Sequence, residues 1–164
     1  MTWQKEFQSQ IDTRMGRSVD FKWKEPLSKH TYFRNVGPAA ALVFPSHVEE
    51  LIALAEIAGK LGVRTFILGK GSNVLAPDCG FDGLVIKTQH LHTEVLEENH
   101  QILAGAGVAI TFLLRKATEN GWGGFEFLTG VPGSVGGALA MNAGTHLGEV
   151  NDRLFAVEIL ADGK

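Results

Sequence analysis

Two glycine-rich segments carry the residues whose types and spacing are best suited to ligand chemistry. The first, LGKGSN over residues 68–73, follows an apolar run and contains Gly69 and Gly71. Successive backbone N–H groups in such a turn form a concave anion site that needs no cationic side chain. Ser72 and Asn73 add a hydroxyl and an amide, whereas Lys70 adds a charge or is simply solvated. Taken alone, the segment is equally consistent with a plain tight turn.

This first segment matches neither of the common phosphate-binding motifs. The P-loop pattern G-x-x-x-x-G-K-[ST] is absent from it. A dinucleotide fingerprint requires a third glycine after Gly69 and Gly71, and that glycine is missing. Ala76 and Pro77 also argue against a helix immediately after the loop.

The second segment, GVPGSVGGALAMNAG over residues 130–144, is more specific. It contains five glycines: Gly130, Gly133, Gly136, Gly137 and Gly144. Pro132 restricts the backbone beside them, and small alanines let the main chain approach a flat, bulky group. Asn142 offers a donor and an acceptor together, which suits the edge of a ring. The alternative is a glycine-rich packing contact, although such a contact needs one or two glycines rather than five.

A third segment, AGAG over residues 104–107, lies between a predicted strand and a predicted helix, and helix N-termini favour anionic groups. Together, the three segments suit a long ligand with phosphates and a flat ring. Other chemistry has little support. The six histidines are scattered, no H-E-x-x-H pattern occurs and Cys79 is the only cysteine, so no metal site is predicted.

These segments must be positioned by helices and strands that the apolar pattern predicts. A short helical arm is expected over residues 3–15, followed by irregular chain over 18–38. A β-α-β unit follows, with strands at 39–44 and 63–68. Its helix should begin at a capping box formed by Ser46 and Glu49, and end at Gly62.

The remainder of the chain alternates short elements with loops. The expected elements are a strand at 84–88, a hairpin of residues 92–98 and 101–107 turning at Asn99-His100, a helix at 109–120 closed by Gly121, loop and short helix over 121–149, and a strand at 153–160. Asp162-Gly163 then signals a hairpin turn whose second strand is missing. This ending predicts a chain that is part of something longer, and the alternative is a frayed terminus.

Composition narrows the class of protein. The chain has 164 residues, 45% hydrophobic and 20% charged, with a formal net charge of −3. This is typical of a soluble globular protein of one domain, or of one domain plus an arm. There is no basic excess for nucleic-acid binding and no apolar run near the roughly 20 residues that span a membrane. A polar start without a signal sequence and a single cysteine predict a cytoplasmic protein.

Four ordered motifs resemble one family. They are EPLSKHTYFRNVGPA (25–39), LGKGSNVLAPDCG (68–80), AGAG (104–107) and GFEFLTGVPGSVGGALAMNAG (124–144). They resemble the flavin-binding half of the UDP-N-acetylenolpyruvoylglucosamine reductase family, over residues 21–164. The resemblance implies an α+β, two-subdomain FAD-binding fold of the vanillyl-alcohol-oxidase type, starting with the β-α-β unit. It divides the chain into a helical arm (1–20) and a truncated FAD-binding domain (21–164), without the substrate-binding domain.

The resemblance also implies a reaction and a cofactor site. NADPH would reduce FAD, and the enolpyruvyl group of a UDP-sugar would then be reduced to UDP-N-acetylmuramate, a peptidoglycan precursor. The implied FAD-binding residues are Gly69, Lys70, Gly71, Ser72, Asn73, Val74, Leu75, Gly130, Val131, Pro132, Gly133, Ser134, Gly136, Gly137, Asn142, Ala143 and Gly144. No catalytic residue is implied here, because the family's Tyr-Arg motif, proton-donating serine and C-terminal glutamate would follow residue 164. The chain alone is expected to be inactive.

Two other functions remain open at this point. A non-catalytic FAD-binding module would share the fold without the reaction, because fold alone does not determine function. Another flavin oxidoreductase of the same fold would act on alcohols or lactones instead. The oligomeric state is not predicted.

Overall fold

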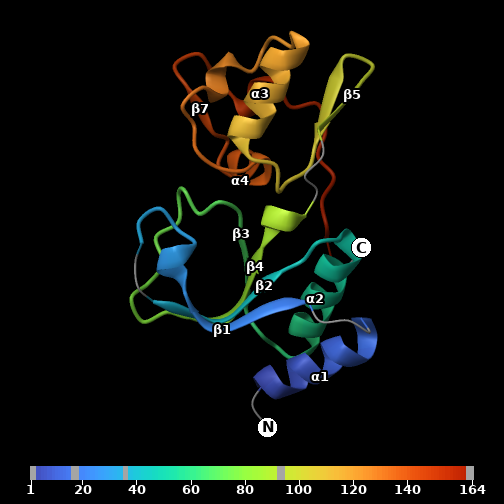
Figure 1. The fold of residues 1–164 in the computed structure, drawn as a ribbon, viewed down its shortest axis with the longest axis vertical. Helices are drawn as coiled ribbons and strands as arrows, with labels where there is room; N and C mark the ends of the chain where they lie inside the picture. The colour runs from blue at the N-terminus through green and yellow to red at the C-terminus, as the bar shows by residue number, and fades with distance from the viewer. Residues whose placement is uncertain (1–2, 16–18, 35–36, 92–94, 162–164) are drawn as a thin grey trace.

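The computed structural model describes residues 3–15, 19–34, 37–91 and 95–161. Figure 1 shows two parts stacked along the long axis, joined near residue 91. The first part holds a mixed sheet with two helices, and the second holds a hairpin, short helices and long loops. No helix in the described ranges is long and apolar enough to cross a membrane.

The sheet of the first part has the strand order β1-β2-β4-β3. Its strands are β1 (Asp20–Pro26), β2 (Pro38–Phe44), β3 (Thr65–Leu68) and β4 (Phe81–Lys87). Strands β2 and β3 both run parallel to β4, which lies between them, and β1 pairs antiparallel with β2. The predicted strands at 39–44, 63–68 and 84–88 are therefore confirmed, with small shifts at their ends.

Strand β1 corrects the expectation of irregular chain over 18–38. Its sequence, DFKWKEP, has little apolar content, and most of its residues are exposed or half-buried. It becomes a strand because the edge of β2 offers backbone hydrogen-bond partners, from Asp20 opposite Phe44 to Pro26 opposite Pro38. Tertiary pairing here outweighs a weak local preference. A short 3₁₀ helix, η1 (Leu27–Lys29), follows the strand.

Apolar side chains cover both faces of the sheet. On one face, β2 and β4 pack against α1 (Trp3–Met15) and α2 (Val48–Lys60). Phe7 and Ile11 of α1 are fully buried in this cluster, so the predicted helix is confirmed and is part of the core. The other face carries a second cluster that includes Leu42, Leu68 and Val85. Burial on both faces is typical of parallel strands and explains their continuous apolar runs.

Helix α2 begins differently from the prediction and ends as predicted. Its N-cap is His47, and no side chain caps it, so the predicted capping box is wrong. Instead, the Ser46 backbone N–H donates a hydrogen bond to Glu50 Oε2 at 2.7 Å. The helix starts one residue later than that box requires, which brings Glu50 rather than Glu49 back toward Ser46. At the other end, Gly62 has a φ of 63°, the left-handed conformation that terminates helices.

The second part is built from short elements. They are η2 (Thr88–His90), β5 (Val95–Glu98), β6 (Gln101–Ala104), α3 (Ile110–Asn120), η3 (Glu126–Leu128), α4 (Val135–Ala140), β7 (Gly144–Thr145), β8 (Gly148–Glu149) and η4 (Val150–Asp152). The hairpin of β5 and β6 is confirmed, with positive φ at Asn99 and His100 as a two-residue turn requires. Gly121 ends α3 at a φ of 68°, as predicted.

The predicted strand at 153–160 is wrong. Arg153 is a turn residue, and residues 154–161 have no strand pairing; all of them are exposed, including Phe155 at 81% and Ile159 at 73%. An alternating apolar pattern indicates strand preference, but a strand also needs a hydrogen-bonding neighbour, and no described segment pairs with this one. The Asp162-Gly163 turn lies outside the described residues.

Candidate functional site

The first glycine segment forms the loop that follows β3, and the chain around η1 holds it in place. Gly71 has a φ of 69°, and a Cβ there would lie 2.2 Å from the His30 carbonyl oxygen. The Tyr32 N–H donates a hydrogen bond to the Gly71 carbonyl at 2.9 Å. From the end of the neighbouring strand β4, Lys87 Nζ donates a hydrogen bond to the Gly69 carbonyl at 3.1 Å. The loop backbone is therefore fixed at two carbonyls, one on each glycine.

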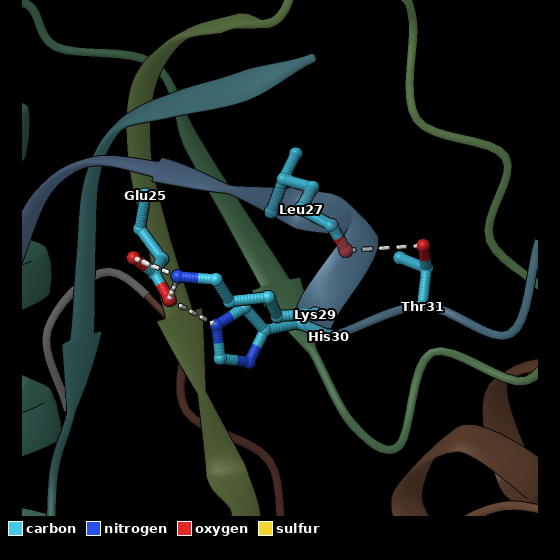
Figure 2. A network of polar contacts seen from close by, with 5 residues as sticks. All are labelled: Glu25, Leu27, Lys29, His30 and Thr31. Carbon is cyan, nitrogen blue, oxygen red and sulfur yellow. Dashed lines mark hydrogen bonds and ion pairs between the residues drawn. The ribbon is translucent and has the colours of Figure 1, made fainter. Parts of the chain in front are cut away.

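A polar network fixes the chain around η1 in turn (Figure 2). Figure 2 shows Lys29 and His30 pointing toward the Glu25 carboxylate, and His30 Nε2 lies 3.1 Å from Glu25 Oε1. Lys29 Nζ lies 3.4 Å from the same oxygen. On the other side of the turn, Thr31 Oγ1 donates to the Leu27 carbonyl at 3.1 Å. This network holds the His30 carbonyl against Gly71.

Burial and charge shift the pKa values within this network. Burial lowers the pKa of His30, a hydrogen bond with Glu25 partly opposes that change, and the charge of Lys87 adds to it. Burial by itself would raise the pKa of Glu25, but the His30 hydrogen bond and the Lys29 charge outweigh it and lower the pKa. A neutral His30 beside an ionised Glu25 is thus the favoured state near neutral pH.

The second glycine segment is hydrogen-bonded to the third. The Ile110 N–H donates to the Gly133 carbonyl at 3.1 Å, and the Val135 N–H donates to Val108 at 2.8 Å. The Gly136 N–H donates to the Ala106 carbonyl at 2.9 Å. Segment 104–107 and the start of α4 therefore lie side by side, as the idea of one shared site requires.

The first and second segments also meet directly. Ser72 Oγ donates a hydrogen bond to the Pro132 carbonyl at 3.0 Å. A Cβ on Gly69 would lie 2.3 Å from Ser134 Oγ, so the two loops approach as closely as a missing side chain allows. Ser134 is buried and caps α4, where its hydroxyl accepts the Gly137 N–H at 3.4 Å. Residues 69–73, 104–107 and 130–137 thus converge where the two parts of the molecule meet.

Unused backbone donors line this convergence. The N–H groups of Lys70, Gly71, Ser72 and Asn73 donate no hydrogen bond to any residue that the structure describes. The same holds, within the described chain, for the N–H groups of Gly133 and Ser134. Gly130 has a φ of 82° and nothing within 4 Å of where its Cβ would be. Clustered donors beside open backbone fit an elongated anionic ligand such as a dinucleotide cofactor.

The last predicted residues have structural contacts of their own. Asn142 Oδ1 accepts a hydrogen bond from the Asn151 N–H at 2.9 Å. A Cβ on Gly144 would lie 2.2 Å from the Gly148 carbonyl, so this glycine is required for the β7–β8 pairing. Val131 and Ala143 pack against the apolar cluster of the second part, Val74 packs against that of the first, and Leu75 is exposed. Contact of these residues with a ligand stays a prediction.

A hollow of about 880 Å³ lies elsewhere in the first part. Its lining includes Trp23, Ala39 and Phe81, so it opens beside the start of β2 and β4. Because β2, β3 and β4 are parallel, the loop after β3 lies at the opposite end of the sheet. The hollow is therefore separate from the glycine loops.

Lys87 is a residue at this site that the sequence did not predict, as are Glu25 and His30. It ends β4, is 6% exposed and contacts the Gly69 carbonyl. The available signal was a charged residue after the apolar run Leu84–Ile86, within the strand predicted at 84–88. Lysine is rarely buried unless paired, but only the structure shows that this side chain is buried.

Comparison with known proteins gives a consistent result. Residues 39–164 match the family described as an FAD binding domain. The chain is 42% identical to the UDP-N-acetylenolpyruvoylglucosamine reductase of Moorella thermoacetica, over 91% of this chain and 49% of the relative. It is 43% identical to the enzyme of the same name from Syntrophobacter fumaroxidans, over 88% of this chain and 44% of the relative. The chain therefore spans about half the length of these relatives.

Solved structures agree with the sequence matches. The crystal structure of UDP-N-acetylenolpyruvylglucosamine reductase from Thermus caldophilus aligns with a TM-score of 0.74 at 35% identity, covering 90% of this chain and 50% of that one. Alkyldihydroxyacetonephosphate synthase aligns with a TM-score of 0.66 at 20% identity, covering 90% of this chain and 32% of that one. The second likeness concerns the fold alone, and both confirm the predicted α+β fold class.

Proposed function

Since the chain belongs to the FAD-binding domain family, we propose that it is the flavin-binding half of a UDP-N-acetylenolpyruvoylglucosamine reductase. The observation that carries this proposal is the meeting of the two glycine loops at Ser72 and Pro132, beside backbone donors that no described residue uses. The similarity to relatives of that name covers most of this chain, from 80% to 91%.

In this proposal, the chain binds and orients the cofactor, and the cofactor carries the chemistry. Bound FAD would supply hydride transfer between NADPH and the enolpyruvyl group of a UDP-sugar. The free N–H groups of residues 70–73 would donate hydrogen bonds to the diphosphate. The open backbone of Gly130 and Gly133 would lie against the ring, and Ser72 would hold the two loops together.

The wider assignments are proposals on the same basis. Residues 1–20 would be an arm, of which α1 packs against the sheet, and residues 21–164 would be the FAD-binding domain. The groups that complete the reaction would belong to the other half of the whole protein. The whole protein would consume NADPH in peptidoglycan precursor synthesis, in the cytoplasm. The site residues given above, from Gly69 to Leu75, from Gly130 to Ser134, Gly136 and Gly137, and from Asn142 to Gly144, would contact FAD.

Titration with FAD tests this proposal. The purified chain should quench flavin fluorescence at a stoichiometry of one, with the visible spectrum of a bound flavin. Ser72→Ala should weaken binding severalfold, because it frees the two loops from each other. Thr118→Ala removes a similarly exposed hydroxyl-to-carbonyl hydrogen bond within α3 and should leave FAD binding unchanged. A folded chain that takes up no flavin would contradict the proposal.

A second experiment addresses the activity of the whole protein. A full-length form should oxidise NADPH when the enolpyruvyl UDP-sugar is added. Oxidation driven instead by alcohols or lactones would favour a different flavin oxidoreductase of the same fold. Tight FAD binding without turnover of either substrate class would favour a non-catalytic module.

A further inference from the structure

Lys87 is a buried cation directly beneath the first glycine loop. It is the last residue of β4, an interior strand of the sheet, and lies in register with Leu68, the last residue of β3. Lys87 is 6% exposed. Its Nζ donates to the carbonyl of Gly69, the residue that precedes the free N–H groups of the loop.

Within the part of the chain that the structure describes, no carboxylate balances this ammonium through an ion pair. The charges around Lys87 are mainly positive. In addition to burial, the charge of Lys70 in the loop lowers the pKa of Lys87. The charges of Lys87 and of Lys22 in β1 in turn add to burial and lower the pKa of His30. The nearby carboxylate, Glu25, is engaged with Lys29 and His30. Burial, followed by the Lys70 charge, lowers the pKa of Lys87.

An unbalanced buried ammonium is costly, and a bound anion removes that cost. The loop above Lys87 is also where donors for an anion remain free. We propose that Lys87 is an electrostatic binding determinant for the anionic, diphosphate part of the cofactor, acting beneath the loop of residues 69–73 while it positions the Gly69 carbonyl. This inference rests on the proposed function and extends it to a residue that the glycine motifs do not include.

The proposal has a consequence for pH. A bound diphosphate favours the ammonium form of Lys87, so binding raises the pKa that burial has lowered. By linkage, FAD binding is then coupled to uptake of a proton by Lys87, at every pH where Lys87 is partly deprotonated in the free protein. The affinity for FAD should therefore fall as pH rises through that range. His30, Lys70 and Lys22 are the other groups that contribute to the charge here, and the variants below separate Lys87 from them.

The test measures dissociation constants for FAD and for riboflavin, which lacks phosphate, from neutral to alkaline pH. Lys87→Met should weaken FAD binding about tenfold at neutral pH, as expected for the loss of a charged partner, and remove most of the alkaline decline. Its riboflavin affinity should change little. Lys87→Arg should retain FAD affinity and extend it to higher pH, because guanidinium stays charged. Lys60→Met, which removes an exposed charge at the end of α2, should behave as wild type.

Competition by inorganic pyrophosphate adds an independent readout. It should displace FAD from the wild-type chain at lower concentration than from Lys87→Met. Equal loss of FAD and riboflavin affinity in Lys87→Met would indicate a structural role and overturn the inference, as would unchanged FAD affinity with the alkaline decline intact. If Lys87→Met does not fold, the pH profile of Lys87→Arg decides, and a profile identical to wild type overturns the inference. A wild-type chain that binds no FAD would instead overturn the proposed function.

Discussion

The two glycine loops contain the same residue type for different physical reasons. In the loop after β3, protein atoms occupy the space that side chains would fill: the His30 carbonyl at Gly71 and the Ser134 hydroxyl at Gly69. In the loop before α4, Gly130 faces open space, and only Ser72 Oγ lies near the Cβ position of Gly133, at 3.3 Å. The first loop uses glycine for close packing, and the second uses it for backbone conformation and open surface.

This difference shows that a glycine count alone does not locate a ligand. Gly136 belongs to the second motif, yet it is closely packed like Gly69 and Gly71 of the first, because a Cβ there would lie 2.9 Å from the Ala106 Cβ. Packing and ligand approach were alternatives at the level of sequence, and the structure shows both close packing and open backbone among these glycines. Substitution by alanine should therefore separate the glycines into two classes by comparing stability with FAD affinity.

Gly71→Ala should have the largest effect. The new methyl group would meet the His30 carbonyl at 2.2 Å, on a backbone whose φ is 69°. The clash and the strained backbone both destabilise the folded state. The free energy of unfolding should therefore fall by about 3 kcal/mol or more, with loss of FAD binding. Urea denaturation measures the change. Gly59→Ala, in α2 with nothing within 4 Å, should instead stabilise by about 0.5–1 kcal/mol.

Gly136→Ala should come next, at about 1–3 kcal/mol of destabilisation. Its methyl group would crowd the Ala106 Cβ at 2.9 Å and the Ala106 carbonyl at 3.1 Å, separating the two strands of chain that hydrogen bonds now join. Adding Ala106→Gly should recover part of the loss, because one of the two contacts is then removed. Thermal denaturation of the single and double variants measures this coupling, and strictly additive losses would contradict it.

Gly130→Ala should affect binding more than stability. Its φ of 82° makes alanine strained by about 1 kcal/mol, but no protein atom obstructs the methyl group. Gly62→Ala is a matched control, since Gly62 has a φ of 63° and equally open surroundings at the end of α2. Both variants should lose similar stability, whereas only Gly130→Ala should weaken FAD binding. Equal FAD affinities in the two variants would place the ligand away from Gly130.

Acidification should have the smallest effect on stability, and it should act through His30 and Glu25, which hold the loop after β3 in place. The pKa of His30 in the folded chain lies below its ordinary value of 6.5, so the unfolded chain binds more protons as pH falls through that value. Stability should therefore decline below about this pH, and the lowered pKa of Glu25 adds a further decline at more acidic pH. His30→Gln should flatten the first decline in urea midpoints measured against pH. If the urea midpoints of His30→Gln declined with falling pH as those of the wild type do, protonation of His30 would not be the cause of the first decline.

Much of the fold could be predicted because its signals are local. The apolar run of β2, the period of α2, Gly62 and the turn at Asn99-His100 each specify structure within a few residues. Strand β1 could not be predicted, because its stabilisation comes from pairing with β2 rather than from its own side chains. The segment 154–161 failed for the opposite reason: it has the pattern of a strand and no described partner.

The site was predictable as motifs and not as contacts. Glycine spacing indicated which segments would converge, and hydrogen bonds between residues 72 and 132, and between 106 and 136, now join them. Lys87 lay outside the motifs, and Glu25 and His30 lay inside the 25–39 motif without a predicted role. Burial and mutual distance decide the role of all three, and neither is a local property. Asn142 seemed free for a ligand, yet its oxygen is engaged with Asn151.

The strand order has a consequence for how the chain assembles. Strands β2 and β3 do not pair with each other. Both pair with β4, which is synthesised after them. During synthesis, β3 of a chain that ends at Leu68 has no strand to pair with, and β2 can pair only with β1. Contacts this distant in sequence slow folding. The loop of residues 69–75 gains its contact with Lys87 only when β4 is in place, so in the proposed function cofactor binding follows the pairing of β3 with β4.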